Sequence, residues 1–291
     1  MKHLLTLLLA CCTGAACAHA AITVRDDAGN SVTLAQPARR IVSLTPHVTE
    51  LLFAAGGERH IAGAGAYSDY PEAAKRIPRV SDAYEIDIER LLAMRPDLII
   101  VWHNGTPARQ LAQLRQLGIP LFHSEPKKLD DIVASVRTFG AMMGTQAVAG
   151  PAAQRMQTQL AQLRGKYAGA SQVPMFYQIL DEKLFTVGGG HILSDAMRTC
   201  GARNIFDDIK VAAASVAAED VLQRNPEAVL SSGEGGDQRG ADYWKAYPKL
   251  LATRRGNLFR VNGDLFSRPG PRMVEGAAVL CERIAQARQR R

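Results

Sequence analysis

One phrase occurs twice in this 291-residue chain, and it constrains the fold more than any other feature. Residues 89–101 read ERLLAMRPDLIIV, and residues 219–231 read EDVLQRNPEAVLS. Two unrelated helix-to-strand junctions could also share such a pattern, so its structural meaning depends on the order of its parts. The matched positions are Glu89/Glu219, Leu92/Leu222, Pro96/Pro226 and Asp97/Glu227.

The first copy shows how the phrase is built. Ile88, Leu91 and Leu92 have helical spacing, and Pro96 predicts the end of that helix because proline lacks a backbone donor and restricts the residue before it. The run that follows, 98–102, is continuously apolar. A continuous apolar run between turn signals is typical of a strand buried on both faces, as in a parallel α/β sheet.

The N-terminus predicts export. MKHLLTLLLACCTGAACAHA has Lys2, an apolar stretch at 4–10 and small residues up to Ala20. This pattern is typical of a secretory signal, here residues 1–20 with cleavage after Ala20; a lipidated Cys11 is the alternative. No later segment has the ~18 apolar residues needed to cross a bilayer. We therefore expect the mature chain to be soluble and exported.

Cleavage of the signal would leave two of the five cysteines, Cys200 and Cys281. In an oxidising compartment such a pair predicts one disulfide, and two buried free thiols are the alternative. The net charge of +7 falls to +6 when Lys2 is removed, and the basic residues are scattered apart from the C-terminal RIAQARQRR. Nucleic-acid binding would need a basic face with interleaved aromatic residues, which the sequence lacks.

About 270 residues remain after residue 20, which favours two lobes at ~100–200 residues per domain. Apolar runs alternate with helical patterns in both halves, as βαβ units do. ITVRDDAGNSVTL, at 22–34, predicts a hairpin ahead of the first half. The further strands are expected at 40–44, 61–65, 98–102, 120–123, 174–180 and 258–261, and the helices at 48–55, 107–117, 129–143, 192–200, 241–252 and 270–288.

Between the two copies lies PAAQRMQTQLAQLRGKYAGA, with Pro151 placed for a helix start. Extended to the residues before Pro151, the helix would have ~20 residues and a length of ~30 Å, enough to bridge two lobes. The predicted organisation is therefore a signal at 1–20, an N-terminal lobe at 21–145, a connecting helix at 146–169 and a C-terminal lobe at 170–291.

Conspicuous side chains follow several predicted strands, where open α/β sheets bind ligands. These segments are 45–47, 67–70, 102–103, 185–190 and 262–272, and two facing rims of this kind would line a cleft rich in aromatic rings. Trp102 could instead cap the core, and Tyr70 could be a turn residue before Pro71.

The sequence contains no pattern for a resident metal or a catalytic nucleophile. It has no HExxH or His-x-His pair and no GxSxG elbow. A three-histidine site built from His47, His103 and His191 is the metal alternative. We therefore expect neither a catalytic residue nor a cofactor, and the protein is expected not to be an enzyme.

The segments RIVSLTPHVTELLFAAGG, GAYSDYPEAAKRIPRVSDAYEIDIERLLAMRPDLIIVW, TCGARNIF and RPGPR resemble a known family. They are similar to the periplasmic substrate-binding proteins of ABC importers for cobalamin, haem and ferric siderophores, and most similar to the cobalamin branch. The resemblance covers essentially the whole mature chain. It implies two Rossmann-like lobes joined by one rigid helix, a periplasmic location, a monomer and an inner-membrane ABC permease as partner.

The resemblance also implies roles for individual residues. Glu89 and Glu219 match surface carboxylates that dock onto permease arginines, and Cys200–Cys281 matches the disulfide of the family. A Glu that merely favours the first turn of a helix is the alternative for both docking positions. The expected ligand-binding residues are Pro46, His47, Tyr67, Tyr84, Trp102, Phe185, Asp264, Phe266 and Arg268.

The chain departs from the cobalamin branch at two places. That branch has a Trp where this chain reads Asp82-Ala83-Tyr84, and another where it reads Ala212-Ala213-Ala214. The haem branch has an axial Tyr near the first of these segments, two residues from Tyr84. Three function classes follow: a corrinoid carrier, which we favour, a haem or siderophore carrier, and a secreted enzyme on a similar fold.

Overall fold

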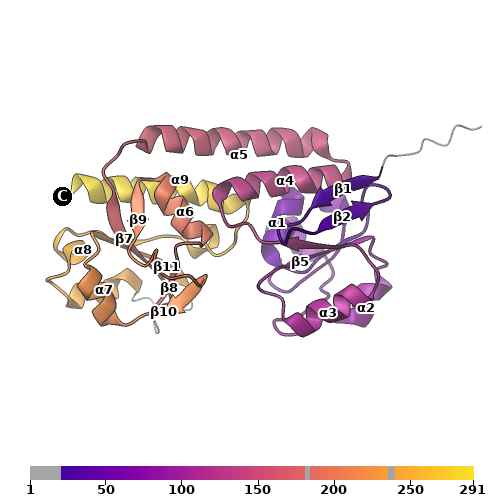
Figure 1. Ribbon diagram of the computed structural model, residues 1–291, viewed down its shortest axis with the longest axis horizontal. Helices are drawn as coiled ribbons and strands as arrows, with labels where there is room; N and C mark the ends of the chain where they lie inside the picture. The colour runs from indigo at the N-terminus through magenta and orange to yellow at the C-terminus, as the bar shows by residue number, and fades with distance from the viewer. Residues whose placement is uncertain (1–20, 181–183, 235–239) are drawn as a thin grey trace, which may run out of the picture.

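Two lobes lie side by side beneath one long helix in the computed structural model, which describes residues 21–180, 184–234 and 240–291 (Figure 1). The predicted signal at 1–20 lies outside the described residues. Within the described ranges, no helix combines the length and the apolar character needed to cross a membrane.

The first lobe is built on a four-stranded parallel sheet in the order β4-β3-β5-β6. Along β5, Leu98 and Ile100 belong to one core and Ile99 and Val101 to another, so the continuous apolar run is explained by burial on both faces. The strands are β3 (Ile41–Ser43), β4 (Ile61–Ala64), β5 (Leu98–Trp102) and β6 (Leu121–Ser124).

Helices cover both faces of this sheet. Those that pack toward the long connecting helix are α1 (Pro46–Ala54) and α4 (Leu129–Met143), and those on the other face are α2 (Ile88–Ala93) and α3 (Ala108–Gln116). The expected hairpin is present as antiparallel β1 (Ile22–Arg25) and β2 (Ser31–Leu34). Two short 3-10 helices, Glu58–His60 and Glu72–Arg76, complete the lobe.

The second lobe repeats this plan with the parallel order β12-β11-β7-β9. Its strands are β7 (Val173–Leu180), β9 (Ala202–Asn204), β11 (Ala228–Glu234) and β12 (Leu258–Arg260). Its helices are α6 (Ile192–Thr199) and α9 (Pro271–Gln289) on one face, and α7 (Ala218–Arg224) and α8 (Leu251–Arg254) on the other. The prediction of two Rossmann-like lobes is therefore confirmed.

Helix α5 (Gln146–Tyr167) links α4 to β7 and spans both lobes along the upper edge of Figure 1. It packs on α4 in the first lobe and on α9 in the second. Pro151 lies inside this helix at an exposed position and does not begin it. A single long helix thus connects the two lobes.

The second lobe differs from the sequence expectation in two places. The helix expected at 241–252 is instead a 3-10 helix at Gly240–Ala246 followed by the separate α8, because Pro248 cannot continue a helix. A short antiparallel ribbon of β8 (Phe185–Val187) and β10 (Ala213–Ser215) was not predicted. Three-residue strands carry too little periodicity to be recognised.

The two copies of the repeated phrase form the same junction. Leu91 and Val221 are both fully buried on the inner face of their helices. The residues before the two prolines, Arg95 and Asn225, both have a φ of 45°, in the left-handed region. Each chain segment therefore leaves its helix through the same turn and enters a central strand, β5 or β11.

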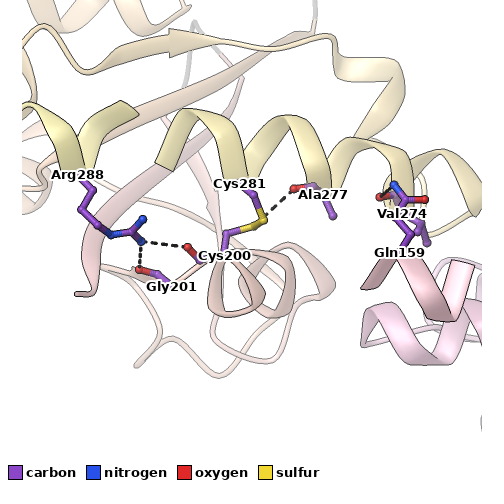
Figure 2. Close-up of a disulfide and its surroundings, with 7 residues drawn as sticks. All are labelled: Gln159, Cys200, Gly201, Val274, Ala277, Cys281 and Arg288. Carbon is purple, nitrogen blue, oxygen red and sulfur yellow. Dashed lines mark hydrogen bonds between the residues drawn. A yellow bond between two sulfur atoms is a disulfide. The ribbon is translucent and has the colours of Figure 1, made fainter. Parts of the chain in front are cut away.

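A disulfide joins Cys200, at the end of α6, to Cys281 in α9, with 4.7 Å between their Cα atoms (Figure 2). This is the expected pairing. Two turns further along α9, Arg288 donates to the carbonyl oxygens of Cys200 and Gly201 at 3.1 and 3.2 Å. The end of α6 is thus held to α9 by a covalent bond and by hydrogen bonds.

Candidate ligand-binding cleft

A cleft of about 590 Å³ lies between the lobes, at the carboxyl ends of their parallel strands. This is where open α/β sheets place ligands. Segments after β3, β4, β5 and β12 supply most of its walls. The first lobe contributes Thr45, Pro46, His47, Tyr67 and Trp102, and the second contributes Ser232, Asn262, Gly263, Asp264, Ser267, Arg268 and Pro269.

Two smaller hollows adjoin this cleft. The first, of about 230 Å³, shares Thr45, Pro46 and Tyr67 with it and contains Tyr84. The second, of about 380 Å³, shares Trp102, Ser267 and Pro269 with it and contains Phe266. We call the second hollow the side chamber.

The structure brings eight of the nine expected ligand-binding residues to these hollows. Six line the central cleft, namely Pro46, His47, Tyr67, Trp102, Asp264 and Arg268. Tyr84 and Phe266 line the two adjoining hollows, and the side chain of Phe266 is almost fully buried. Phe185 lines none of the three; it lies in β8, not in a loop after a strand, and it is partly buried.

Large aromatic rings stand exposed in the cleft and in the smaller hollow beside it. The exposed fractions are 67% for Tyr67, 84% for Tyr84 and 40% for Trp102, so Trp102 does not simply cap the core. A Cβ atom on Gly105 would lie 1.8 Å from Cε3 of Trp102, which means that the backbone at Gly105 packs directly against the indole. This glycine fixes the ring, and the sequence alone gave no signal for its role.

The backbone of Tyr67 is strained. Its φ is 58°, in a region that non-glycine residues rarely adopt. Such strain persists where the surrounding structure holds it in place, and it is found mainly at binding and catalytic sites. The conformation leaves the phenol exposed on the cleft wall.

The cleft floor contains an uncharged histidine. Burial, with a smaller contribution from the Arg268 guanidinium, lowers the pKa of His47 to about 3. Its ring meets Trp102 edge-on with 6.1 Å between centroids. In the part of the chain that the structure describes, three cleft residues have a buried polar atom without a hydrogen-bond partner: Nε2 of His47, Oγ1 of Thr45 and Oγ of Ser232.

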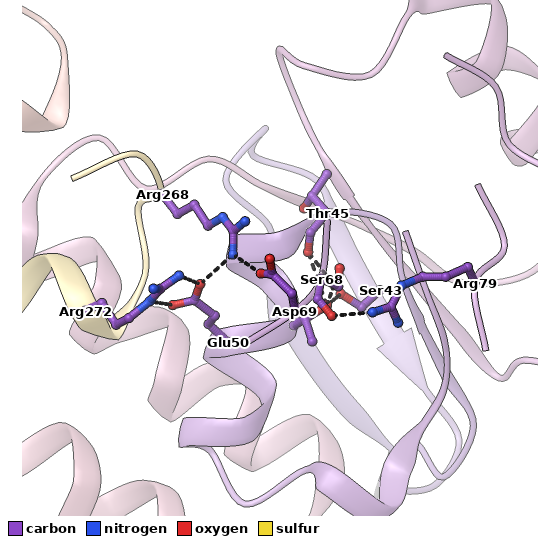
Figure 3. A network of polar contacts seen from close by, with 9 residues as sticks. Ser43, Thr45, Glu50, Ser68, Asp69, Arg79, Arg268 and Arg272 are labelled. Carbon is purple, nitrogen blue, oxygen red and sulfur yellow. Dashed lines mark hydrogen bonds and ion pairs between the residues drawn. The ribbon is translucent and has the colours of Figure 1, made fainter. Parts of the chain in front are cut away.

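An ionic network joins the lobes at one end of the cleft (Figure 3). Arg268 precedes α9, Arg272 is the second residue of α9, and both reach Glu50 of α1. Arg268 also pairs with Asp69 at 2.8 Å. The hydrogen bond to Glu50 raises the pKa of Arg272, whose guanidinium lies 4.2 Å from the ring centroid of Tyr70.

Glu50 is a residue of the interlobe contact that was not predicted from the sequence, where it stands in a largely apolar helix. Its side chain is only 2% exposed. A lone acidic residue among the apolar positions of 48–55 was the available signal, because buried carboxylates are almost always paired. Tyr70 is more than a turn residue, since its ring packs against Arg272.

His47, His103 and His191 do not come together as a metal site in the described part of the chain. Among the described residues there is no group of three His, Cys, Asp or Glu side chains placed to hold a metal ion. His103 instead contacts His123, with 3.4 Å between their Nδ1 atoms. Nδ1 of His191 accepts a hydrogen bond from the backbone N–H of Leu193.

Glu89 and Glu219 occupy equivalent places in the two lobes. Each is exposed and is the second residue of its helix, α2 or α7. Both helices lie along the lower side of Figure 1, on the side of the molecule away from α5. The two carboxylates therefore belong to the same side of the protein and to different lobes.

Comparison with known proteins agrees with this geometry. The pattern of the periplasmic binding protein family matches residues 41–258. The vitamin B12-binding protein of Vibrio cholerae serotype O1 is 35% identical over 86% of this chain and 91% of its own length.

Solved structures agree as well. The crystal structure of the periplasmic vitamin B12-binding protein of Vibrio cholerae superposes with a TM-score of 0.79, at 34% identity over 86% of this chain and 98% of that one. A periplasmic haem-binding protein in complex with two haems shares the fold, with a TM-score of 0.74 and 22% identity over 86% and 98% of the two chains. The chain belongs to the periplasmic binding protein family.

Proposed function

We propose that the protein is a periplasmic carrier that captures a corrinoid such as cobalamin between its lobes and delivers it to an inner-membrane ABC permease. The observation that carries this proposal is the interlobe cleft, whose walls combine exposed Tyr67 and Trp102 rings with a small number of polar groups. A wide macrocycle gains binding free energy mainly by burying apolar area against such rings. The relatives named for vitamin B12 binding support the same ligand class.

Capture and release, rather than catalysis, is the proposed activity. The one histidine on the floor of the central cleft is held neutral by burial, so it is unsuited to proton transfer near pH 7. A bound corrinoid should therefore be recovered chemically unchanged. Mass spectrometry of the ligand before and after incubation with the protein tests this expectation.

Delivery is proposed to use the carboxylates of Glu89 and Glu219. A carboxylate that meets an arginine in a partly desolvated contact forms a charge-assisted pair, and two such pairs far apart fix the orientation of a rigid body. The starts of α2 and α7 place the exposed Glu89 and Glu219 in different lobes on one side of the molecule. The carrier is proposed to dock as a monomer.

A haem carrier is the second candidate, because Tyr84 presents an exposed phenol beside the cleft. If Tyr84 held a haem iron, Tyr84→Phe would change the Soret spectrum of the complex. With a corrinoid, the same substitution should weaken binding by less than ~1 kcal/mol, the typical net value of one hydrogen bond.

Calorimetric titration of the ligand-free protein with cyanocobalamin, haem and a ferric siderophore, side by side, separates the candidates. The proposal expects cyanocobalamin to bind at least ten times more tightly than the others. Tighter binding of haem or of the siderophore would replace it.

A further inference from the structure

The side chamber has a composition unlike that of the central cleft. It opens from the cleft past Trp102 and has a volume of about 380 Å³, within the range of small-molecule sites. Both lobes line it, and each contributes one lysine: Lys127, in the loop after β6, and Lys210, in the loop after β9. One lysine from each lobe therefore lines the same chamber.

Neither lysine is neutralised by an ion pair within the described ranges, and both are exposed. Asp208, two residues before Lys210, is held by Arg224 through two hydrogen bonds of 2.9 Å. Glu125 also lines the chamber, but its Oε2 accepts the backbone N–H of Asn104 at 3.1 Å. The two lysines and the Glu125 carboxylate together leave the chamber with one net positive charge for a ligand.

The remaining wall is largely apolar. Burial lowers the pKa of His191 to about 4, so this ring adds no charge near pH 7. Ala212, at the edge of the β8–β10 ribbon, contributes only a methyl group and leaves the chamber open. The larger apolar side chains of the wall are Ile192, Val211, Phe266 and Met273.

We propose that the side chamber is an anion subsite that holds the phosphodiester arm of a corrinoid, with Lys127 and Lys210 on the phosphate. This inference rests on the proposed function and specifies which part of the ligand occupies which part of the cleft. The nucleotide arm of a cobalamin carries one negative charge next to a flat apolar base. The paired cations match the charge, and the apolar wall matches the base. A bare carboxylate would match only the cations.

The test compares two ligands that differ by this arm. Cyanocobalamin has the phosphodiester and the base, whereas dicyanocobinamide lacks both. In Lys127→Gln/Lys210→Gln the Kd of cyanocobalamin should rise about tenfold, because the variant loses the charged hydrogen bonds that both lysines make to the phosphate. The Kd of dicyanocobinamide should change by less than about twofold in the same variant.

A matched control removes the same total charge elsewhere. Lys166→Gln/Lys249→Gln replaces two exposed lysines outside the cleft and should leave both Kd values unchanged. Together the variants separate the local contact from the general loss of positive charge.

The outcomes distinguish this subsite from the proposed function. If neither corrinoid binds the folded wild-type protein, the proposed function is refuted. If both bind, and Lys127→Gln/Lys210→Gln changes their Kd values no more than the control variant does, the anion subsite is overturned while the corrinoid carrier stands. If haem binds and loses affinity in the Lys127→Gln/Lys210→Gln variant, the anion is a porphyrin carboxylate and the phosphodiester assignment is wrong.

Discussion

Arg272 donates two hydrogen bonds to Glu50 of the opposite lobe, from Nη2 to Oε1 at 2.6 Å and from Nε to Oε2 at 3.1 Å (Figure 3). Both side chains are nearly removed from solvent, at 11% and 2% exposure. Arg268 adds a third contact to the same carboxylate at 3.3 Å and also lines the ligand cleft. Arg268 thus links this contact between the lobes to the binding site.

Removing one partner of this buried pair should be costly. Glu50→Gln leaves two arginines without their shared carboxylate, and we expect a loss of ~3–5 kcal/mol in the free energy of unfolding, measured by urea denaturation. Asp130→Asn breaks an exposed pair with Arg164 and should cost less than ~1 kcal/mol. Equal losses in the two variants would contradict the role given to Glu50.

Trp102 should act in binding more than in stability. Trp102→Ala is expected to weaken ligand binding by ~1–3 kcal/mol through lost apolar area and stacking, with little change in melting temperature. The contrasting change is Trp244→Ala, which removes a fully buried ring and should cost ~3–5 kcal/mol of stability. A destabilised Trp102→Ala with unchanged affinity would make Trp102 a core residue.

Acidification should destabilise the protein through His47. Its pKa is about 3 in the folded state against ~6.5 when unfolded, so the unfolded chain binds more protons between these values. Stability is therefore lost as the pH falls below ~6.5, by about 2 kcal/mol at pH 5 from this group alone. His47→Asn should remove that part of the loss. An identical pH profile in this variant would show that His47 is not the cause.

Docking should depend on Glu89 and Glu219 without involving the ligand. Each Glu→Ala change should leave ligand affinity intact but weaken the complex with the permease by ~2–5 kcal/mol if the facing arginine is left buried. Reversal of both charges should abolish uptake in cells that have no other carrier. Glu282→Lys, which changes an exposed residue of α9, is the control. Normal transport by Glu89→Lys/Glu219→Lys would exclude the docking role.

The disulfide should contribute to the stability of the second lobe. Cys200 and Cys281 are 81 residues apart, and closing a loop of that length is worth up to ~4 kcal/mol in the chain-entropy model. Protein purified without reductant should contain no titratable thiol, and reduction should lower its melting temperature. Two free thiols in the oxidised, folded protein would contradict the pairing.

The strongly patterned parts of the fold were predictable. Continuous apolar runs such as 98–102 mark strands buried on both faces, and helical spacing with glycine or proline stops marks the helices between them. The prediction of one helix at 241–252 was wrong because Pro248 separates a 3-10 helix from α8. The β8–β10 ribbon could not be found, since its pairing joins residues that are far apart in the sequence.

The cleft was predictable in outline only. Strand ends identify Tyr67 and Trp102 as wall residues, because parallel strands deliver their following loops to one edge. The contact of Gly105 with Trp102 and the cross-lobe bond of Glu50 depend on tertiary distances that no local pattern encodes. Phe185 lies in β8, which pairs with β10, and lines none of the three hollows, so its role in binding stays a prediction.

The duplicated junction has a consequence for the geometry of assembly. Each lobe carries the same helix-to-strand turn, with its Glu at the second helical position and a left-handed residue before the proline. A membrane partner made of two identical subunits would therefore meet one such element on each subunit. At these junctions such a partner could bind the carrier in two poses half a turn apart, which differ in the lobe that each subunit contacts.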